Sequence, residues 1–468
     1  MVAREGMSGI SSDVQKCVEV YFLQYCDAGV GSPYHLLQQL SFRSGANAVN
    51  RCCSLYLELN PVVEGNYTSG SGARPQKKKA FTPGALATDL KPSFTLMRAL
   101  GLLPIEGMDT ANPSFRPTSG IFVYSMMCYL VVSGLAISVA GYVIAHLQRY
   151  RDNDDGSIYI TAFLVSLVPS LFLHPCYWFE TKKVVALLKS WVEFQEMFLR
   201  TTGTQLKLSL WRLSMFLTMA VPVVTFLVVM GELFIFNLAQ PNLAVAYTLT
   251  ISMLVDHGTV WLLQCIAICR SSQLIKDCLK LTLRRKRGAV SLRALEALWL
   301  RLSRLCTATA QALSAAHLVA TITFSIVFLM CAYGFIIMFD KPDMGLLTGG
   351  LGGYAVCIVT YLAMVYNAGY IVIATMNDFC DEEIDDLVAR DENIRDELHK
   401  FLHAVKLNQP FISFAGVVDV NRKFMSSFAS AMLTYIVVLA QFRVGGDSSD
   451  LKAQLTLSTP VTTTEASP

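Results

Sequence analysis

Residues 243–268 read LAVAYTLTISMLVDHGTVWLLQCIAI, an apolar run interrupted by one acidic residue and its histidine neighbour. At 1.5 Å per residue in a helix, this run is long enough to cross the hydrocarbon core of a bilayer, which is about 30 Å thick. The whole chain suits that environment, because its 468 residues are 53% hydrophobic and only 16% charged, with a mean hydropathy of +0.45. Composition therefore indicates a membrane protein and not an ordinary soluble domain.

Six further apolar runs accompany this one. The seven predicted spans are residues 118–145, 157–177, 213–236, 243–268, 315–339, 350–376 and 424–441. The last run is the shortest and the most polar, and a helix of that kind at lipid depth needs protein or water against one side. We therefore predict an all-α fold, a polytopic membrane protein with seven transmembrane helices.

The distribution of basic residues favours one orientation. The loops after the second, fourth and sixth spans contain 22 Lys and Arg, whereas the loops after the first, third and fifth contain 3. Cytoplasmic loops carry the excess of basic residues. We therefore expect a plasma-membrane protein with its N-terminus in the cytoplasm and its C-terminus outside. G-protein-coupled receptors have the opposite orientation, which would export all 22 of these residues.

Three regions follow from this topology. Residues 1–90 are expected to be a flexible cytoplasmic leader, with a Gly- and Ser-rich stretch at 65–79. Residues 91–442 form the seven-helix domain, and 443–468 form a short extracellular tail. Apolar residues spaced by three and four along 384–405 predict an amphipathic helix, so we expect helices that extend into the cytoplasm.

Other classes of function find little support. The chain has no CxxC pair and no constellation of catalytic residues, so we expect no enzyme activity, metal or cofactor. A net charge of +3 is too small to indicate a nucleic-acid partner.

Ionisable and polar side chains inside the spans are the best candidates for functional residues, because placing them in lipid costs free energy. Asp256 and His257 lie in the middle of the fourth span, with Trp261 and Gln264 one and two turns further on. Further candidates in the fifth and sixth spans are Tyr333, Tyr361, Tyr366, Asn367 and Tyr370. A ligand pocket and ordinary structural packing both explain these residues, and the pattern leaves the two open.

The last span carries a periodic polar stripe. Ser427, Ser430, Thr434, Val438 and Gln441 recur every three or four residues and share one face of a helix. Several copies around an axis would enclose a conduit in which the apolar valine forms a constriction. A buried packing seam would show the same periodicity.

The stretch 434–442, TYIVVLAQF, matches the TYhhhhhQF motif of the arthropod gustatory receptor family, relatives of the insect odorant receptors, where h is a hydrophobic residue. Two further stretches resemble that family. LMRALGLLP at 96–104 is similar to the segment before its first helix, and 414–424 is similar to the approach to its last helix. The resemblance covers about residues 90 to 442.

The resemblance implies a chemosensory, ligand-gated, non-selective cation channel of four identical or related subunits in membrane lipid. It places the pore at Thr434, Val438, Gln441 and Phe442, and a pocket for a small-molecule tastant or gas-derived ligand among the second to sixth helices. Sugar-responsive members carry Glu after the Thr-Tyr pair, where this chain has Ile436. Bitter compounds, carbon dioxide and internal metabolites stay open. The alternatives are a non-conducting receptor that signals through a cytoplasmic partner, and a secondary transporter.

Overall fold

The computed structural model describes residues 85–108, 112–149, 154–235, 240–284, 289–338, 345–378, 392–414, 416, 418–420, 426–438 and 441. All of them belong to one compact unit, Gly65–Pro468. Most of the predicted leader, the whole predicted tail and Phe442 lie outside the described residues, so the regional division at both ends stays a prediction.

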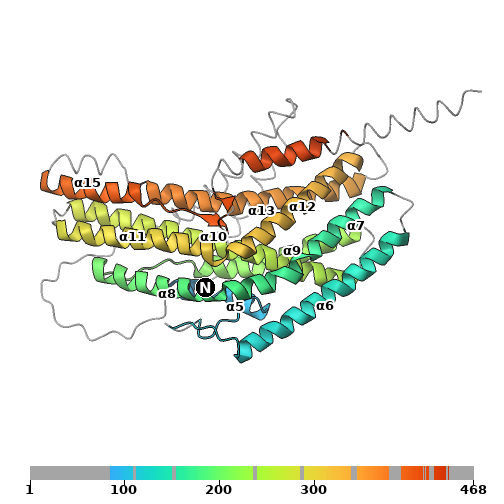
Figure 1. The fold of residues 1–468 in the computed structure, drawn as a ribbon, viewed down its shortest axis with the longest axis horizontal. Helices are drawn as coiled ribbons and strands as arrows, with labels where there is room; N and C mark the ends of the chain where they lie inside the picture. Colours follow the sequence, from blue (N-terminus) through green and yellow to red (C-terminus); the bar gives the residue numbers. More distant parts are fainter. Residues whose placement is uncertain are drawn as a thin grey trace, which may run out of the picture. The chain divides into compact units, whose positions relative to one another are not determined.

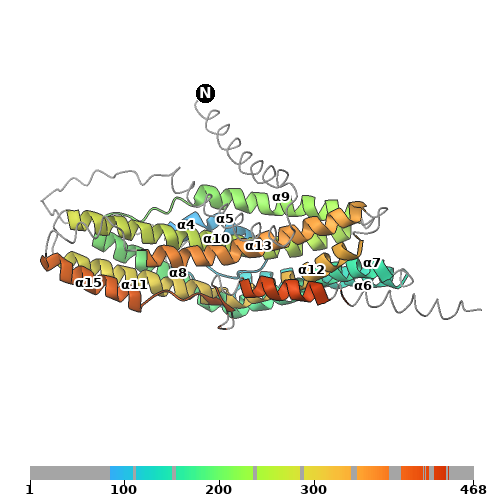
Figure 2. The same ribbon diagram turned by 90° about the horizontal axis from the view of Figure 1, so that it is seen from above.

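The described chain is built from long helices that run side by side (Figures 1 and 2). Two short helices, α4 (Ala85–Asp89) and α5 (Lys91–Ala99), come first. The long apolar helices are α6 (Gly120–Arg149), α7 (Asp154–Leu167), α8 (Pro169–Thr202), α9 (Trp211–Ile235), α10 (Pro241–Arg284), α12 (Ser314–Met338) and α13 (Gly345–Asn377). An apolar helix at Ser426–Val438, the red helix of Figure 1, follows later and is called the last helix below.

The predicted polytopic helical membrane fold is confirmed. Six helical stretches among the described residues are long and apolar enough to cross a bilayer, and the last helix is a shorter apolar one. The second span differs from its prediction, because the chain turns at Val168, directly before Pro169, and divides the span into α7 and α8. Proline lacks the amide hydrogen that would continue the helix, which explains the break at this point.

A small hairpin departs from the purely helical prediction. Strand β1 (Ser413–Phe414) pairs antiparallel with β2 (Val418–Asp419), in a register that places Ser413 opposite Asp419. Gly416, between the strands, has a φ of 70°, a conformation that glycine adopts without a steric penalty. Strands of two residues show no alternating pattern, so the sequence gives no signal for them.

Helix α10 is the most enclosed span. Of its apolar stretch 78% is buried, whereas the other five spans are 22–44% buried. It packs against α9 on one side and α13 on another. Polar side chains on α10 therefore face protein and not lipid.

Beyond the spans, several helices continue as a separate bundle. Helices α8 and α10 have 34 and 44 residues, although about 20 suffice to cross a bilayer. Their C-terminal parts pack with α11 (Ala289–Ala312) and α15 (Glu392–Leu407) at one end of the molecule (Figure 1). The predicted extension of helices beyond the membrane is thus confirmed, and its cytoplasmic side stays a prediction.

Apolar packing and ion pairs join α11 to its neighbours in this bundle. Leu298, Trp299 and Leu302 on α11 are completely buried. At the surface, Arg293 on α11 donates to Glu397 on α15 over 3.0 Å. Hydrogen bonds from Arg293 and Lys400 hold the pKa of Glu397 at about 2, below its ordinary value of 4.5. Exposed pairs of this kind align two helices more than they stabilise them.

The junction between this bundle and the membrane spans is held by a buried carboxylate. Glu180 on α8, 2% exposed, accepts hydrogen bonds from the Ser314 hydroxyl over 2.9 Å and from the Ala315 amide over 2.7 Å. These groups belong to the first turn of α12, where the amide hydrogens have no partner within the helix. The positive end of the helix dipole also lies there. Glu180 therefore fixes the point at which α11 ends and α12 begins.

The predicted orientation has a direct test. A peptide tag placed after Phe442 should be labelled by antibody on intact cells, because the C-terminus is expected outside. A tag inserted at Gly288, between α10 and α11, should be labelled only after permeabilisation. The reverse pattern would refute the orientation and restore the G-protein-coupled receptor class.

Candidate functional site

An internal cavity lies between α7, α9, α10, α12 and α13. About 30 Å³ of its volume admits the centre of a water molecule. Because one water needs roughly 10–15 Å³ measured in this way, the cavity holds a very small molecule without rearrangement. Its walls are mainly apolar, and the polar residues among them are Ser166, Glu232, Tyr247 and Tyr354.

Tyr247 gives this cavity an unusual feature. Its side chain is 1% exposed, and its hydroxyl has no hydrogen-bond partner among the described residues. An unpartnered buried hydroxyl costs free energy, roughly 1–3 kcal/mol, that a bound ligand could recover. Glu232 adds a carboxylate to the same wall. The cavity can therefore offer two hydrogen-bonding groups within an apolar surface, which is typical of small-molecule sites.

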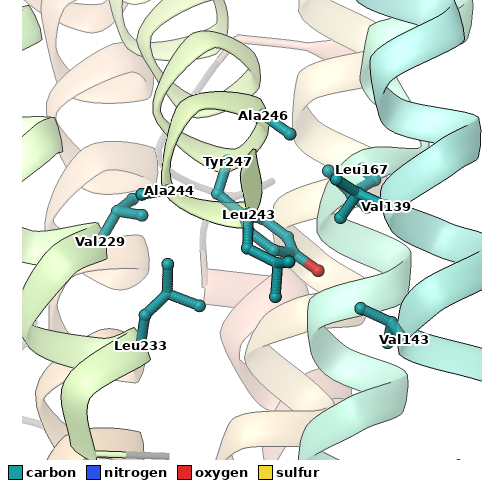
Figure 3. Packing of buried hydrophobic residues seen from close by; sticks show 9 residues of the cluster. All are labelled: Val139, Val143, Leu167, Val229, Leu233, Leu243, Ala244, Ala246 and Tyr247. Atoms are coloured by element: carbon teal, nitrogen blue, oxygen red, sulfur yellow. The ribbon is translucent and has the colours of Figure 1, made fainter. Parts of the chain in front are cut away.

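A packed apolar cluster formed by α6, α7, α9 and α10 adjoins the cavity, with which it shares Val229 and Tyr247. Figure 3 shows Tyr247 on α10, with Leu167 and Val139 on one side of that helix and Val229 and Leu233 on the other. The Phe163 ring meets Tyr247 edge to face, with the ring centres 5.2 Å apart. This packing fixes the orientation of Tyr247 in the wall.

Further along α10 lies a second buried group of residues, the histidine–aromatic cluster: Tyr177, His257, Trp261, His317 and Phe414. The Tyr177 hydroxyl hydrogen-bonds His257 Nδ1. The centres of the His257 and His317 rings are 4.0 Å apart. The Phe414 ring stacks on His317, with the ring centres 4.4 Å apart. Trp261 contacts His317 and Phe414 with its ring and donates its indole N–H to the Val365 carbonyl over 3.0 Å. Four helices and strand β1 thus meet at one point.

Unpartnered polar atoms surround this cluster. Asp256 is completely buried, and neither of its carboxylate oxygens has a hydrogen-bond partner among the described residues. The same holds for Nε2 of both His257 and His317. Buried polar groups are usually satisfied. Their accumulation here favours a functional region over inert packing.

The nine predicted ligand residues fall into two groups. Asp256, His257 and Trp261 lie on α10 at the cluster. The Tyr366 ring meets Phe414 edge to face, with the ring centres 6.0 Å apart. The Tyr361 hydroxyl donates to the Leu254 carbonyl over 2.9 Å.

The remaining four lie elsewhere or make other contacts. Gln264 and Asn367 each have one buried side-chain atom that lacks a partner among the described residues. Tyr333 lies sixteen residues after His317 on α12, about 24 Å along the helix. Tyr370 is half-buried on α13. None of the nine lines the cavity, so their role in ligand binding stays a prediction.

Sequence reasoning missed several residues of these two sites. Glu232 and His317 are ionisable residues within predicted spans, so the cost argument that selected Asp256 applied to them as well. Tyr177 and Phe414 gave no comparable signal. Phe414 reaches the cluster from a short strand, 97 residues beyond His317 in the chain.

Two of the predicted pore residues, Thr434 and Val438, lie on the last helix, which the described part of the chain leaves largely uncovered. All 13 residues of the last helix are exposed or half-buried, and Tyr435 is 60% exposed. Thr434 and Gln441 are exposed, Val438 is 38% exposed, and the Thr434 hydroxyl donates to the Ser430 carbonyl over 2.9 Å. Phe442 lies outside the described residues. The surface of this helix is therefore available to lipid, water or further subunits.

Apolar spans around an internal, mainly apolar cavity define a polytopic α-helical membrane protein. Residues 90–444 match the 7tm chemosensory receptor family, and the chain belongs to that family, which is one of receptors and not of enzymes.

Similar proteins agree with this assignment. The chain is 25% identical to gustatory and odorant receptor 24 of Anopheles gambiae over 76% of its length and 78% of the relative's. It is 24% identical to gustatory and odorant receptor 21a of Drosophila melanogaster, over 76% and 80%. The fold resembles the insect olfactory receptor OR5 of Machilis hrabei in complex with eugenol, with a TM-score of 0.54, 15% identity and coverage of 76% and 98%. The predicted relation to insect gustatory receptors is confirmed.

Asp256→Asn tests whether the unpartnered carboxylate is functional. We expect the half-maximal agonist concentration to shift by about 2- to 30-fold while surface expression persists, since coupling residues typically contribute 0.5–2 kcal/mol. Cell-surface labelling and dose–response curves measure both quantities. The control is Glu196→Gln on α8, a partly exposed carboxylate that pairs with Arg200 over 3.4 Å, and it should change neither. Loss of surface protein with an unchanged agonist response in the remainder would assign Asp256 a structural role.

Proposed function

We propose that this receptor is a ligand-gated, non-selective cation channel of the plasma membrane, with its N-terminus in the cytoplasm. A small molecule binds in the cavity, and four identical or related subunits place their last helices around a common pore. The observation that carries the proposal is the combination of an internal, mainly apolar cavity that contains Glu232 and the unpartnered Tyr247 hydroxyl with a last helix that none of the described packing buries. The cavity suits ligand binding, and the uncovered last helix suits assembly with further subunits.

The cavity favours a small, mainly apolar ligand with a hydrogen-bonding group. A polyhydroxylated ligand would bury many polar groups against apolar walls and leave them unpaired, which is costly. Ile436, in the place of the glutamate of sugar-responsive relatives, agrees with this. Bitter compounds, dissolved carbon dioxide and small internal metabolites are the classes to test. Eugenol, which the Machilis receptor binds in its structure, is a further candidate of suitable polarity, and the cavity must widen to admit it.

Helix α10 supplies the route from ligand to pore. Ile251 and Tyr247 line the cavity, and His257 and Trp261 lie about two to four turns further along the same helix. There they contact His317 and Phe414. Phe414 belongs to strand β1, and the chain reaches the last helix soon after β2. A shift of α10 on ligand binding would therefore move the segment that positions the last helix.

The last helix suits a pore because its two kinds of surface need different neighbours. Thr434 and Gln441 require water or hydrogen-bonding partners at membrane depth. Leu433, Tyr435 and Val437 are exposed apolar side chains that suit lipid or adjacent helices. A ring of copies satisfies both requirements, with Val438 as an apolar constriction that excludes water when narrow.

Ligand-evoked current tests the proposal and separates it from its rivals. Cells that express the chain, alone or with a related subunit, should pass a cation current when exposed to a panel of bitter alkaloids, dissolved carbon dioxide and eugenol. A non-conducting receptor would produce a second-messenger response without such a current. A secondary transporter would show saturable uptake at far lower turnover. Either outcome would contradict the channel.

Val438→Ser tests the gate. A serine would make the constriction wet, so we expect current without ligand, measured as leak normalised to surface protein. Gln441→Ala should change conductance or ion preference more than leak. Tyr435→Ala, on a different face, should reduce assembly without producing leak. Equal ligand-dependent currents in Val438→Ser and the wild type would show that this face does not form the gate.

A further inference from the structure

A second hollow lies at the opposite end of the first span from the internal cavity. It measures about 330 Å³ and is formed by α4, α5 and the beginning of α6. Lys91, Thr95 and Arg98 on α5 supply its polar side together with Tyr124 on α6, and Phe94 and Met108 supply apolar surface. Lys91, Thr95 and Arg98 are spaced by four and three residues, so they share one face of α5.

The opposite side of α5 is fixed to the bundle. The Ser93 hydroxyl is within hydrogen-bond distance of Ser214 and Thr218 on α9, at 3.1 and 2.9 Å. At the end of the helix, the Tyr124 hydroxyl donates to the Ala99 carbonyl over 2.7 Å. His174 on α8 hydrogen-bonds the next carbonyl, that of Leu100, over 3.0 Å. The basic face is thus held toward the hollow by contacts with three spans.

The charge of the hollow is one-sided. Among the described residues its lining contains two cationic side chains and no carboxylate. The acidic residue next to it in sequence, Asp89, accepts a hydrogen bond from the Leu210 amide over 3.1 Å and is engaged on the α9 side. Burial raises the pKa of Asp89 above its ordinary value. The Thr95 hydroxyl donates to the Lys91 carbonyl, so the two cations supply the attraction for an anion.

The position of the hollow at the start of the first span places it at the level of the lipid headgroups in the proposed topology. Tyr124 is in the second turn of α6, whose span begins at Gly120, and tyrosine is enriched at this level of membrane proteins. The residues before this span belong to the end of the molecule that is expected in the cytoplasm, where the bilayer leaflet is rich in anionic lipids.

We propose that Lys91 and Arg98 bind the phosphate of an anionic glycerophospholipid, with its glycerol and upper acyl carbons against Phe94, Met108 and the ring of Tyr124. The assignment of the cytoplasmic leaflet rests on the proposed orientation, whereas the site itself does not. Helix α5 forms hydrogen bonds with α9 and with the start of α6. A lipid bound to α5 would therefore strengthen the attachment of the first span to the other helices.

Binding is measured with the purified full-length chain in neutral detergent and a fluorescent short-chain phosphatidylserine, followed by anisotropy. The same measurement with phosphatidylcholine tests the need for net negative charge. We expect Lys91→Gln and Arg98→Gln each to weaken phosphatidylserine binding about fivefold, and the double variant about 25-fold, since each basic residue near an anionic surface contributes about one such factor. Arg98→Lys should retain most of the affinity and shows that the fold is intact.

Arg116→Gln is the matched control, because Arg116 is an exposed basic residue just before the same span and lies outside the lining. It should change affinity by less than about twofold. An equal loss with Arg116→Gln, or equal binding of phosphatidylcholine, would overturn the site in favour of diffuse attraction. Complete competition by inorganic phosphate at the lipid's own concentration would overturn the lipid as the ligand. These results do not depend on whether the chain conducts.

Discussion

An ionised side chain at the centre of a bilayer costs about 2.5–3.5 kcal/mol on insertion scales, and Asp256 lies halfway along the fourth span beside His257. The fold meets this constraint by enclosing α10, whose apolar stretch is 78% buried. Helices α9 and α13 cover it, and the more exposed helices α6 and α9 face outward with apolar side chains. The two candidate sites lie along α10 because it is the span that protein surrounds most completely.

In the proposed channel, the enclosure of α10 also provides the connection between distant parts of the chain. The cavity and the histidine–aromatic cluster share one helix, so a displacement at Tyr247 acts on the same rigid element as His257 and Trp261. Trp261 donates to the Val365 carbonyl over 3.0 Å, which links α10 to α13. Gly258 permits the close approach of these helices, since a side chain there would meet the Tyr361 ring at about 2.6 Å. Phe414 completes the connection to the hairpin before the last helix.

The sequence predicted the features that depend on local hydrophobicity, such as the membrane spans. It predicted few of the features that depend on tertiary contacts, such as the cavity and the cluster. The spans followed from apolar length, and the interest of Asp256 and His257 followed from their cost in lipid. The second span was predicted as one helix, and the break at Val168 follows from Pro169. The cavity could not be predicted, because Ser166, Tyr247 and Tyr354 come from three helices and are ordinary residues in each. Phe414 meets His317 through a hairpin with no periodic pattern, and Glu180 meets the first turn of α12 across 134 residues.

The most direct test of the account is the effect of Phe414→Ala on ligand-evoked current, compared with Phe411→Ala. Phe411 is 56% exposed in the same segment, whereas Phe414 is 1% exposed and stacked on His317. The account predicts that Phe414→Ala abolishes or strongly right-shifts the ligand response at equal surface protein, while Phe411→Ala responds like the wild type. It also predicts that adding Phe414→Ala to Val438→Ser leaves the ligand-independent leak in place, because the gate lies after the cluster. A wild-type ligand response in Phe414→Ala would contradict coupling through the cluster.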